Sequence, residues 1–105
     1  RGLPYHEATI RLTTQLEGVG TPADVYAFTC LAIETLTGDV PFPRGTDAAV
    51  MYAHVIDPPP SLHERRPELP KPLDEAIARG MAKDPDDRPP TARALLMEML
   101  QALAA

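Results

Sequence analysis

The chain has 105 residues, enough for one small domain or part of one. Its formal net charge of −5 argues against binding to nucleic acid or to an anionic membrane surface, because both attract a basic field. No apolar run reaches the roughly 18 residues of a membrane span, and a single cysteine, Cys30, excludes an internal disulfide. We therefore expect a cytoplasmic protein with no span in this segment and with Cys30 as a reduced core residue.

The first half of the sequence predicts two helices. Residues 1–20 lack a clean apolar stripe, although a helix over 4–17 fits their apolar positions. Thr21 is then placed to cap a helix in which Pro22 takes the first position, and Gly38 is a typical stop. Residues 25–33 are apolar almost all round, so we expect this helix to be buried on every side, at the centre of a larger fold.

The middle of the chain predicts a short helix between two loops. Residues 39–45 are rich in Pro and Gly, and Thr46 follows as a cap. The apolar positions of the short helix are Ala49, Val50, Ala53 and either His54 or Val55. Prolines 58–60 enforce an extended backbone, and we expect 58–70 to be a proline-rich loop with little regular structure.

Two further helices are predicted on either side of a rigid turn at 84–90. The helix over 71–83 has core residues at helical spacing: Leu73, Ile77, Gly80 and Met81. Thr91 caps the last helix, whose core face consists of Leu95, Leu96, Met99, Leu100 and Leu103. No long strand-like alternation occurs, so the predicted class is all-α, with four to five helices and a Pro-rich loop.

Three segments of the sequence are specific when taken together. They are Asp24-Val25-Tyr26-Ala27-Phe28 continuing to Gly38 and Pro41-Phe42; Ala53-His54-Val55 followed by prolines 58–60; and Ala82-Lys83-Asp84-Pro85-Asp86-Asp87-Arg88-Pro89 followed by Thr91-Ala92. In this order they resemble the C-terminal lobe of a bacterial, actinobacterial-like serine/threonine protein kinase domain. Each motif alone is weakly specific, whereas all of them at family-like spacing are a strong match. The resemblance implies that residues 21–105 are kinase C-lobe helices and that residues 1–20 are a divergent segment at the position of the substrate-side loop.

Two positions correspond to structural residues of the family. The resemblance implies that Asp24 would hold the backbone of the catalytic loop in a complete kinase, whereas the residues alone indicate an ordinary capping acid. Arg88 would pair with the glutamate of an A-P-E motif, but Thr14 stands where that glutamate belongs. Arg88 therefore either pairs with one of the acids Glu7, Glu17, Asp86 and Asp87 or faces solvent as a turn arginine.

The motifs of phosphoryl transfer are missing from these 105 residues. There is no Gly-rich phosphate loop, no catalytic-loop Asp and Asn pair and no D-F-G. His6, His54 and His63 lie far apart with one cysteine, and the acids at 84–87 lack the calcium-loop pattern, so we expect no metal. The sequence thus predicts no catalytic, cofactor-binding or metal-binding residue, with ATP and Mg²⁺ needed only by a complete parent kinase.

Two functions fit these observations. In the first, the chain is the C-terminal portion of a kinase domain, non-catalytic in isolation, and supplies the C-lobe scaffold and a substrate-side surface to the rest of that domain. In the alternative, it is a stand-alone kinase-remnant or pseudokinase-like helical module that binds a protein partner, with a homodimer through a bare 25–33 surface as one form. Upstream H-R-D and D-F-G motifs would favour the first function, and a start codon close to residue 1 the second.

Overall fold

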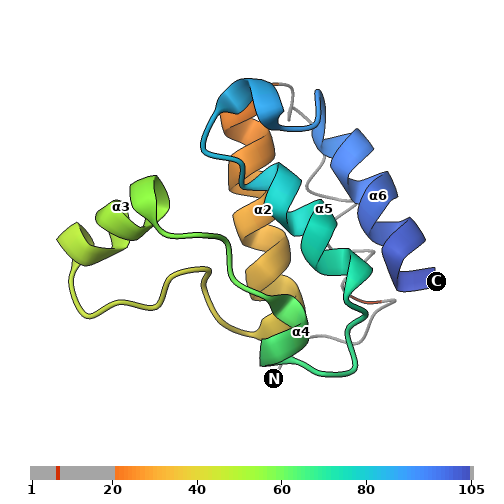
Figure 1. Cartoon of the computed structure of the whole chain (residues 1–105), viewed down its shortest axis with the longest axis horizontal. Helices are drawn as coiled ribbons and strands as arrows, with labels where there is room; N and C mark the ends of the chain where they lie inside the picture. Colours follow the sequence, from red (N-terminus) through yellow and green to blue (C-terminus); the bar gives the residue numbers. More distant parts are fainter. Residues whose placement is uncertain (1–6, 8–20, 105) are drawn as a thin grey trace.

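The computed structural model describes Glu7 and residues 21–104. This part of the chain forms the helices α2 (Pro22–Thr37), α3 (Asp47–Ile56), α4 (Leu62–Arg65), α5 (Pro72–Gly80) and α6 (Ala92–Ala104), with a single 3₁₀ turn, η1 (Pro85–Asp87), before α6 (Figure 1). No strand occurs among the described residues, and the predicted all-α class is confirmed. No helix in the described part is long and apolar enough to cross a bilayer. The helix predicted over 4–17 lies outside the described residues.

Helix α2 begins and ends where the local signals predict. The Thr21 hydroxyl accepts a hydrogen bond from the backbone N–H of Asp24 at 3.1 Å, and Pro22 occupies the first turn. Gly38 ends the helix in the left-handed conformation, with φ 82°, and its N–H donates to the Glu34 carbonyl at 2.8 Å. Both ends of α2 are thus determined by residues next to it in sequence.

Helix α2 lies at the centre of the fold, but the other helices cover only part of its surface. Helices α4, α5 and α6 pack against it and bury its side chains Val25, Phe28, Ala32, Ile33 and Leu36. The hydroxyl groups of its buried threonines donate hydrogen bonds to backbone carbonyls one turn earlier in the helix. Thr29, for example, donates to the Val25 carbonyl at 2.8 Å. The expectation of all-round burial is wrong at Ala27 and Glu34, which are exposed, because no described helix covers that side.

Helices α5 and α6 pack side by side and cross α2 closely (Figure 1). The four predicted core positions of α5 are all buried, although the helix ends at Gly80 rather than at Lys83. A Cβ atom at Gly80 would clash with the Thr29 hydroxyl and lie 3.0 Å from Leu95 Cδ2, so a hydrogen side chain permits this approach. In α6 the predicted core residues Leu95, Leu96 and Met99 are buried, whereas Leu100 and Leu103 are only partly buried.

The expected irregular loop over 58–70 contains the one-turn helix α4, so that prediction is wrong at 62–65. The Asp74 carboxylate, from α5, accepts hydrogen bonds from the Ser61 hydroxyl at 2.6 Å and from the Leu62 N–H at 2.7 Å. The first backbone N–H group of α4 therefore finds its acceptor on an acid that is distant in sequence, which no local pattern could reveal. From α4, Arg65 donates to the carbonyls of Val40 and Pro41, at 2.9 and 2.6 Å.

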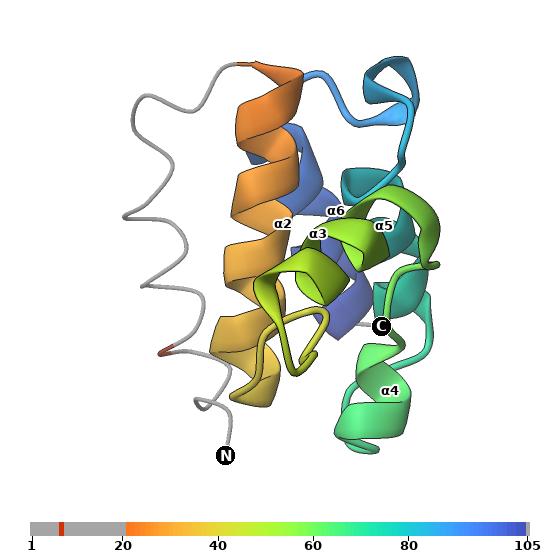
Figure 2. The ribbon, with the colours of Figure 1, turned by 90° about the vertical axis from the view of Figure 1, so that its left-hand side faces the viewer.

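Helix α3 projects from the rest of the bundle, as the views in Figures 1 and 2 agree. Thr46 caps it as predicted, accepting from the Ala49 N–H at 3.1 Å. Ala53 is fully buried and His54 partly so, whereas Val55 is 67% exposed. The open choice between His54 and Val55 is thereby decided for His54, and few side chains of α3 contribute to the core.

Candidate functional site

Arg88 joins the turn after α5 to the first turn of α2. Its Nε donates to the Ala82 carbonyl at 2.8 Å and its Nη1 to the Pro22 carbonyl at 2.9 Å. The guanidinium also lies over the Tyr26 ring, 4.8 Å from the ring centroid. The rigid fork of arginine suits such a bridge between two carbonyl groups.

The acids proposed as partners of Arg88 do not pair with it where the structure describes them. Asp86 and Asp87 are exposed on η1, and none of the ion pairs among the described residues includes Arg88. Glu17 lies outside the described residues. Asp24 is half-buried two residues after Pro22, whose carbonyl Arg88 contacts, so the two positions that resemble structural kinase residues both lie near the N-terminal end of α2. The role of Asp24 toward a catalytic loop stays a prediction.

A cluster around His54 attaches α3 to the body of the fold. The Tyr26 hydroxyl and His54 Nδ1 are hydrogen-bonded at 2.7 Å, and the Phe42 ring meets the imidazole edge-on at 4.9 Å. Lys83 Nζ donates to the His54 carbonyl at 2.8 Å and lies 5.3 Å from the centroid of the Phe42 ring. Sequence analysis missed this cluster because its members come from four separate segments.

Burial shifts the acid–base behaviour of this cluster. It lowers the pKa of His54 below its ordinary 6.5, and the charge of Lys83 lowers that pKa further, so the imidazole is neutral at pH 7. Burial is also the main reason that the pKa of Tyr26 rises to about 12, with the Cys30 thiol adding to the rise and Arg88 opposing it. At neutral pH the two hydrogen-bonded groups therefore carry no charge.

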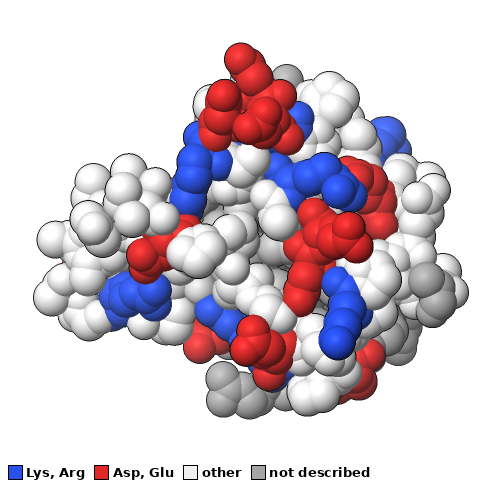
Figure 3. All heavy atoms as spheres, in the orientation of Figure 1, with Lys and Arg blue, Asp and Glu red and all other residues white. Residues whose placement is uncertain are grey.

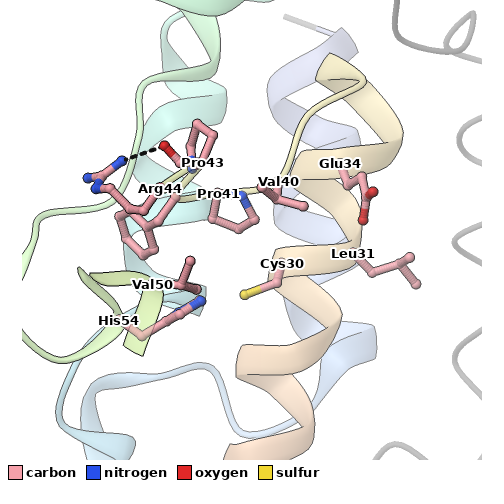
Figure 4. A pocket seen from close by; sticks show the side chains of 10 residues that line it. Cys30, Leu31, Glu34, Val40, Pro41, Pro43, Arg44, Val50 and His54 are labelled. Atoms are coloured by element: carbon pink, nitrogen blue, oxygen red, sulfur yellow. Dashed lines mark hydrogen bonds between the residues drawn. The ribbon is translucent and has the colours of Figure 1, made fainter. Parts of the chain in front are cut away.

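A cavity of about 480 Å³ lies between α2, the loop that follows it and α3 (Figure 4). It is lined by Cys30, Leu31, Glu34, Val40, Pro41, Phe42, Pro43, Arg44, Val50 and His54. Cys30, Val50 and His54 point toward one another across it. At its rim Arg44 pairs with Asp57 at 2.9 Å, whereas Glu34 is exposed and forms no ion pair with a described residue. Such a cavity suits an apolar group with a cation beside it.

Cys30 lies at the edge of this cavity rather than in the core. Burial raises the pKa of its thiol from 9.0 to about 11, against the opposing charges of Lys83 and Arg88. The thiolate that reacts with electrophiles is therefore scarce at pH 7, which indicates a packing role. Among the described residues, no group of three His, Cys, Asp or Glu side chains is arranged to hold a metal ion.

The fold is the helical C-lobe of a protein kinase domain. The crystal structure of the kinase domain of PknI from Mycobacterium tuberculosis matches 97% of this chain and 56% of that chain, with a TM-score of 0.69 and 19% sequence identity. No protein-family model matches the sequence. The particular relatives are serine/threonine protein kinases of mycobacteria, and the resemblance to a kinase C-lobe is confirmed.

Two of these relatives illustrate the extent of the match. The chain is 47% identical over 66 residues to the serine/threonine-protein kinase PknE of Mycobacterium tuberculosis, which covers 63% of this chain and 12% of PknE. It is 38% identical over 82 residues to PknH of Mycobacterium bovis, covering 78% of this chain and 14% of PknH. The chain thus spans a small fraction of the length of the kinases that it matches.

Proposed function

We propose that this chain is the C-terminal portion of a serine/threonine kinase domain, non-catalytic in isolation, which supplies the C-lobe scaffold and a substrate-side surface. The observation that carries the proposal is the similarity to mycobacterial kinases over 63–78% of the chain, on a fold shared with a solved kinase domain. Its partner is then the remainder of the kinase domain, and its location is the cytoplasm.

The missing motifs support the non-catalytic part of the proposal. Phosphoryl transfer needs a phosphate-binding loop, a catalytic base and metal-binding side chains, and these 105 residues contain none of the motifs that carry them. ATP and Mg²⁺ therefore belong to the complete parent kinase. There Asp24 would hold the catalytic loop, while residues 21–105 would support it and residues 1–20 would stand at the substrate-side loop.

The cavity beside α2 supports the substrate-side part. Its walls are mainly apolar, and the exposed carboxylate of Glu34 lies at its rim. A peptide that places a large apolar side chain next to a basic residue would complement both features. We expect a peptide with adjacent leucine and arginine to bind more tightly than the same peptide with glutamate in place of the arginine. Glu34→Gln should remove that difference, and Glu75→Gln, on the exposed side of α5, should keep it.

The main test is a titration of the chain with Mg²⁺ and ATP, followed by amide-resolved NMR and by a phosphate-transfer assay on a generic protein substrate. We expect no saturable shift changes and no transfer. Saturable shifts accompanied by transfer would show that the fold holds a nucleotide site and would refute the proposal.

The alternative function, a stand-alone kinase-remnant or pseudokinase-like binding module, is favoured by one observation. Helix α3 exposes four large apolar side chains, Met51, Tyr52, Val55 and Ile56, as a protein-binding surface does. The all-round apolar run at 25–33 does not provide that surface, because most of its side chains are buried or half-buried. A homodimer, if it forms, needs another face of the described chain.

A further inference from the structure

Helix α3 touches the body of the fold through few side chains. Ala53 is the one buried residue of the helix. His54 is bonded through its ring to the Tyr26 hydroxyl at 2.7 Å and through its carbonyl to Lys83 Nζ at 2.8 Å. A helix of 10 residues is only marginally stable in water by itself, so α3 stays helical through these contacts with the body.

The contact between Tyr26 and His54 requires a neutral imidazole. Among the described residues the Tyr26 hydroxyl has no other hydrogen-bond acceptor, so its hydrogen points to His54 Nδ1. An imidazolium carries a hydrogen on both ring nitrogens and accepts no hydrogen bond. Protonation of His54 therefore breaks this contact as it stands and turns the hydroxyl hydrogen away from the ring.

An imidazolium at this position would also meet other cations. Lys83 Nζ lies 5.3 Å and the Arg44 guanidinium 5.6 Å from the centroid of the Phe42 ring. The same ring meets the His54 imidazole edge-on, with the two centroids 4.9 Å apart. A protonated His54 would thus be a third cation around one aromatic ring, and cations that share one site repel one another.

Several segments packed against His54 contribute titratable or charged groups. They are Tyr26, Cys30 and Glu34 from α2, Arg44 from the next loop, Asp57 at the end of α3, and Lys83 and Arg88 from the segment between α5 and α6. The surface over α3 itself is almost entirely uncharged in Figure 3. Of the two acids, Asp57 is paired with Arg44 at 2.9 Å and Glu34 is exposed at the rim of the cavity, so neither is bonded to the imidazole.

We propose that protonation of His54 is a switch that releases α3 and opens the cavity beside α2. His54 and Val50 belong to the α3 wall of that cavity, opposite Cys30 of α2 (Figure 4). Release of α3 takes this wall away, so a ligand in the cavity loses its contacts with the helix. On the proposed function, on which this consequence rests, mild acid would weaken the binding of a substrate peptide.

The direction and the size of the pH effect follow from linkage. Burial and the charge of Lys83 lower the pKa of His54 below its ordinary 6.5. The attached state of α3 is therefore fully favoured above pH 6.5 and loses this advantage as the pH falls below that value. At pH 5.5 a released His54, with its ordinary pKa, is about nine-tenths protonated, which limits the shift of the release equilibrium to about tenfold. We expect the shift between pH 7.5 and 5.5 to be roughly three- to tenfold.

Amide hydrogen exchange of the 105-residue chain at pH 7.5 and 5.5 tests the proposal, with protection factors corrected for the effect of pH on the intrinsic exchange rate. The backbone N–H of Asp57, which donates to the Ala53 carbonyl, reports on α3. Its protection factor should be roughly three- to tenfold lower at pH 5.5 in the native chain. In His54→Gln it should not change, because the glutamine amide accepts from Tyr26 at either pH.

His63→Gln is the matched control. His63 Nδ1 donates to the Leu69 carbonyl at 2.7 Å, and protonation preserves a bond of this kind because a carbonyl accepts equally from an imidazolium. This variant should therefore show the same loss of α3 protection as the native chain. Far-UV circular dichroism verifies that both variants remain folded.

Lys83→Gln tests the contribution of the neighbouring cation and keeps the test valid if His54→Gln does not fold. It removes the charge but retains a donor for the His54 carbonyl, so the loss of α3 protection should be smaller than in the native chain. The proposal would be overturned by α3 protection that does not depend on pH, by an undiminished loss in these variants, or by α3 amides that exchange no faster than those of α6. Exchange is measured without a peptide, so any of these results would leave the proposed function standing, whereas a peptide that fails to bind at pH 7.5 would leave the switch standing.

Discussion

Replacing Gly80 by alanine is expected to destabilise the fold. Gly80 lies where α5 crosses α2 and α6, and a Cβ atom there would overlap the Thr29 hydroxyl and press on Leu95 Cδ2. Its φ is not positive, so backbone strain does not contribute. The effect of Gly80→Ala therefore comes from packing alone.

The size of the effect follows from three contributions. Overpacking a close crossing costs about 1–3 kcal/mol. Displacing the buried Thr29 hydroxyl from the Val25 carbonyl costs about 1 kcal/mol more. Alanine gains up to about 1 kcal/mol of helix propensity, and less here because Gly80 is the last residue of α5. The free energy of unfolding should fall by about 1–4 kcal/mol, or roughly 4–8 °C in Tm for each kcal/mol.

Urea unfolding followed by circular dichroism measures this loss, with Gly45→Ala as the control. A Cβ at Gly45 would meet no atom within 4 Å, so that variant should be close to neutral. Thr29→Ala removes the overlapping atoms, and in that background Gly80→Ala should cost at least about 1 kcal/mol less. Equal stability of the Gly80→Ala and native chains, or additive effects of the two substitutions, would refute the reasoning.

Two further predictions concern the contacts around α3 and the start of α2. Because folding lowers the pKa of His54, its contribution to the free energy of unfolding should be fully present above pH 6.5 and decline as the pH falls below that value. In unfolding curves recorded from pH 7.5 to 5.5, His54→Gln should flatten that decline. Arg88→Met should lower the free energy of unfolding by about 1–3 kcal/mol, since it leaves the Pro22 and Ala82 carbonyls without their charged donor. Arg88→Lys should restore little of this loss, because one ammonium cannot reproduce the planar fork, and full recovery with lysine would contradict the bridging role.

Local signals predicted the helix starts well. Thr21, Thr46 and Thr91 each accept the backbone hydrogen bond expected of a cap, because a cap involves residues only three positions apart. Hydrophobic spacing likewise placed the core of α5. The choice between His54 and Val55 stayed open because both fit the period, and only the position of Phe42 and Tyr26 decides it.

Long-range contacts explain what the sequence did not reveal. The first N–H group of α4 donates to the Asp74 carboxylate, which belongs to α5. Arg88 donates to the Pro22 carbonyl, 66 residues away in sequence, and not to one of the acids next to it. The cavity is equally non-local, since its walls come from α2, the following loop and α3. The outer face of α3 went unnoticed because periodicity identifies an apolar helix without showing which side is covered.

The loop between α2 and α3 is held through its backbone. Arg65 donates hydrogen bonds to the carbonyls of Val40 and Pro41, and Arg66 donates to the Leu36 carbonyl at the end of α2. Every amino acid offers that same carbonyl, so the anchoring does not depend on which side chains the loop carries. Evolution can therefore exchange exposed loop residues such as Arg44 and retune what the cavity recognises, while the path of the chain around it is inherited unchanged.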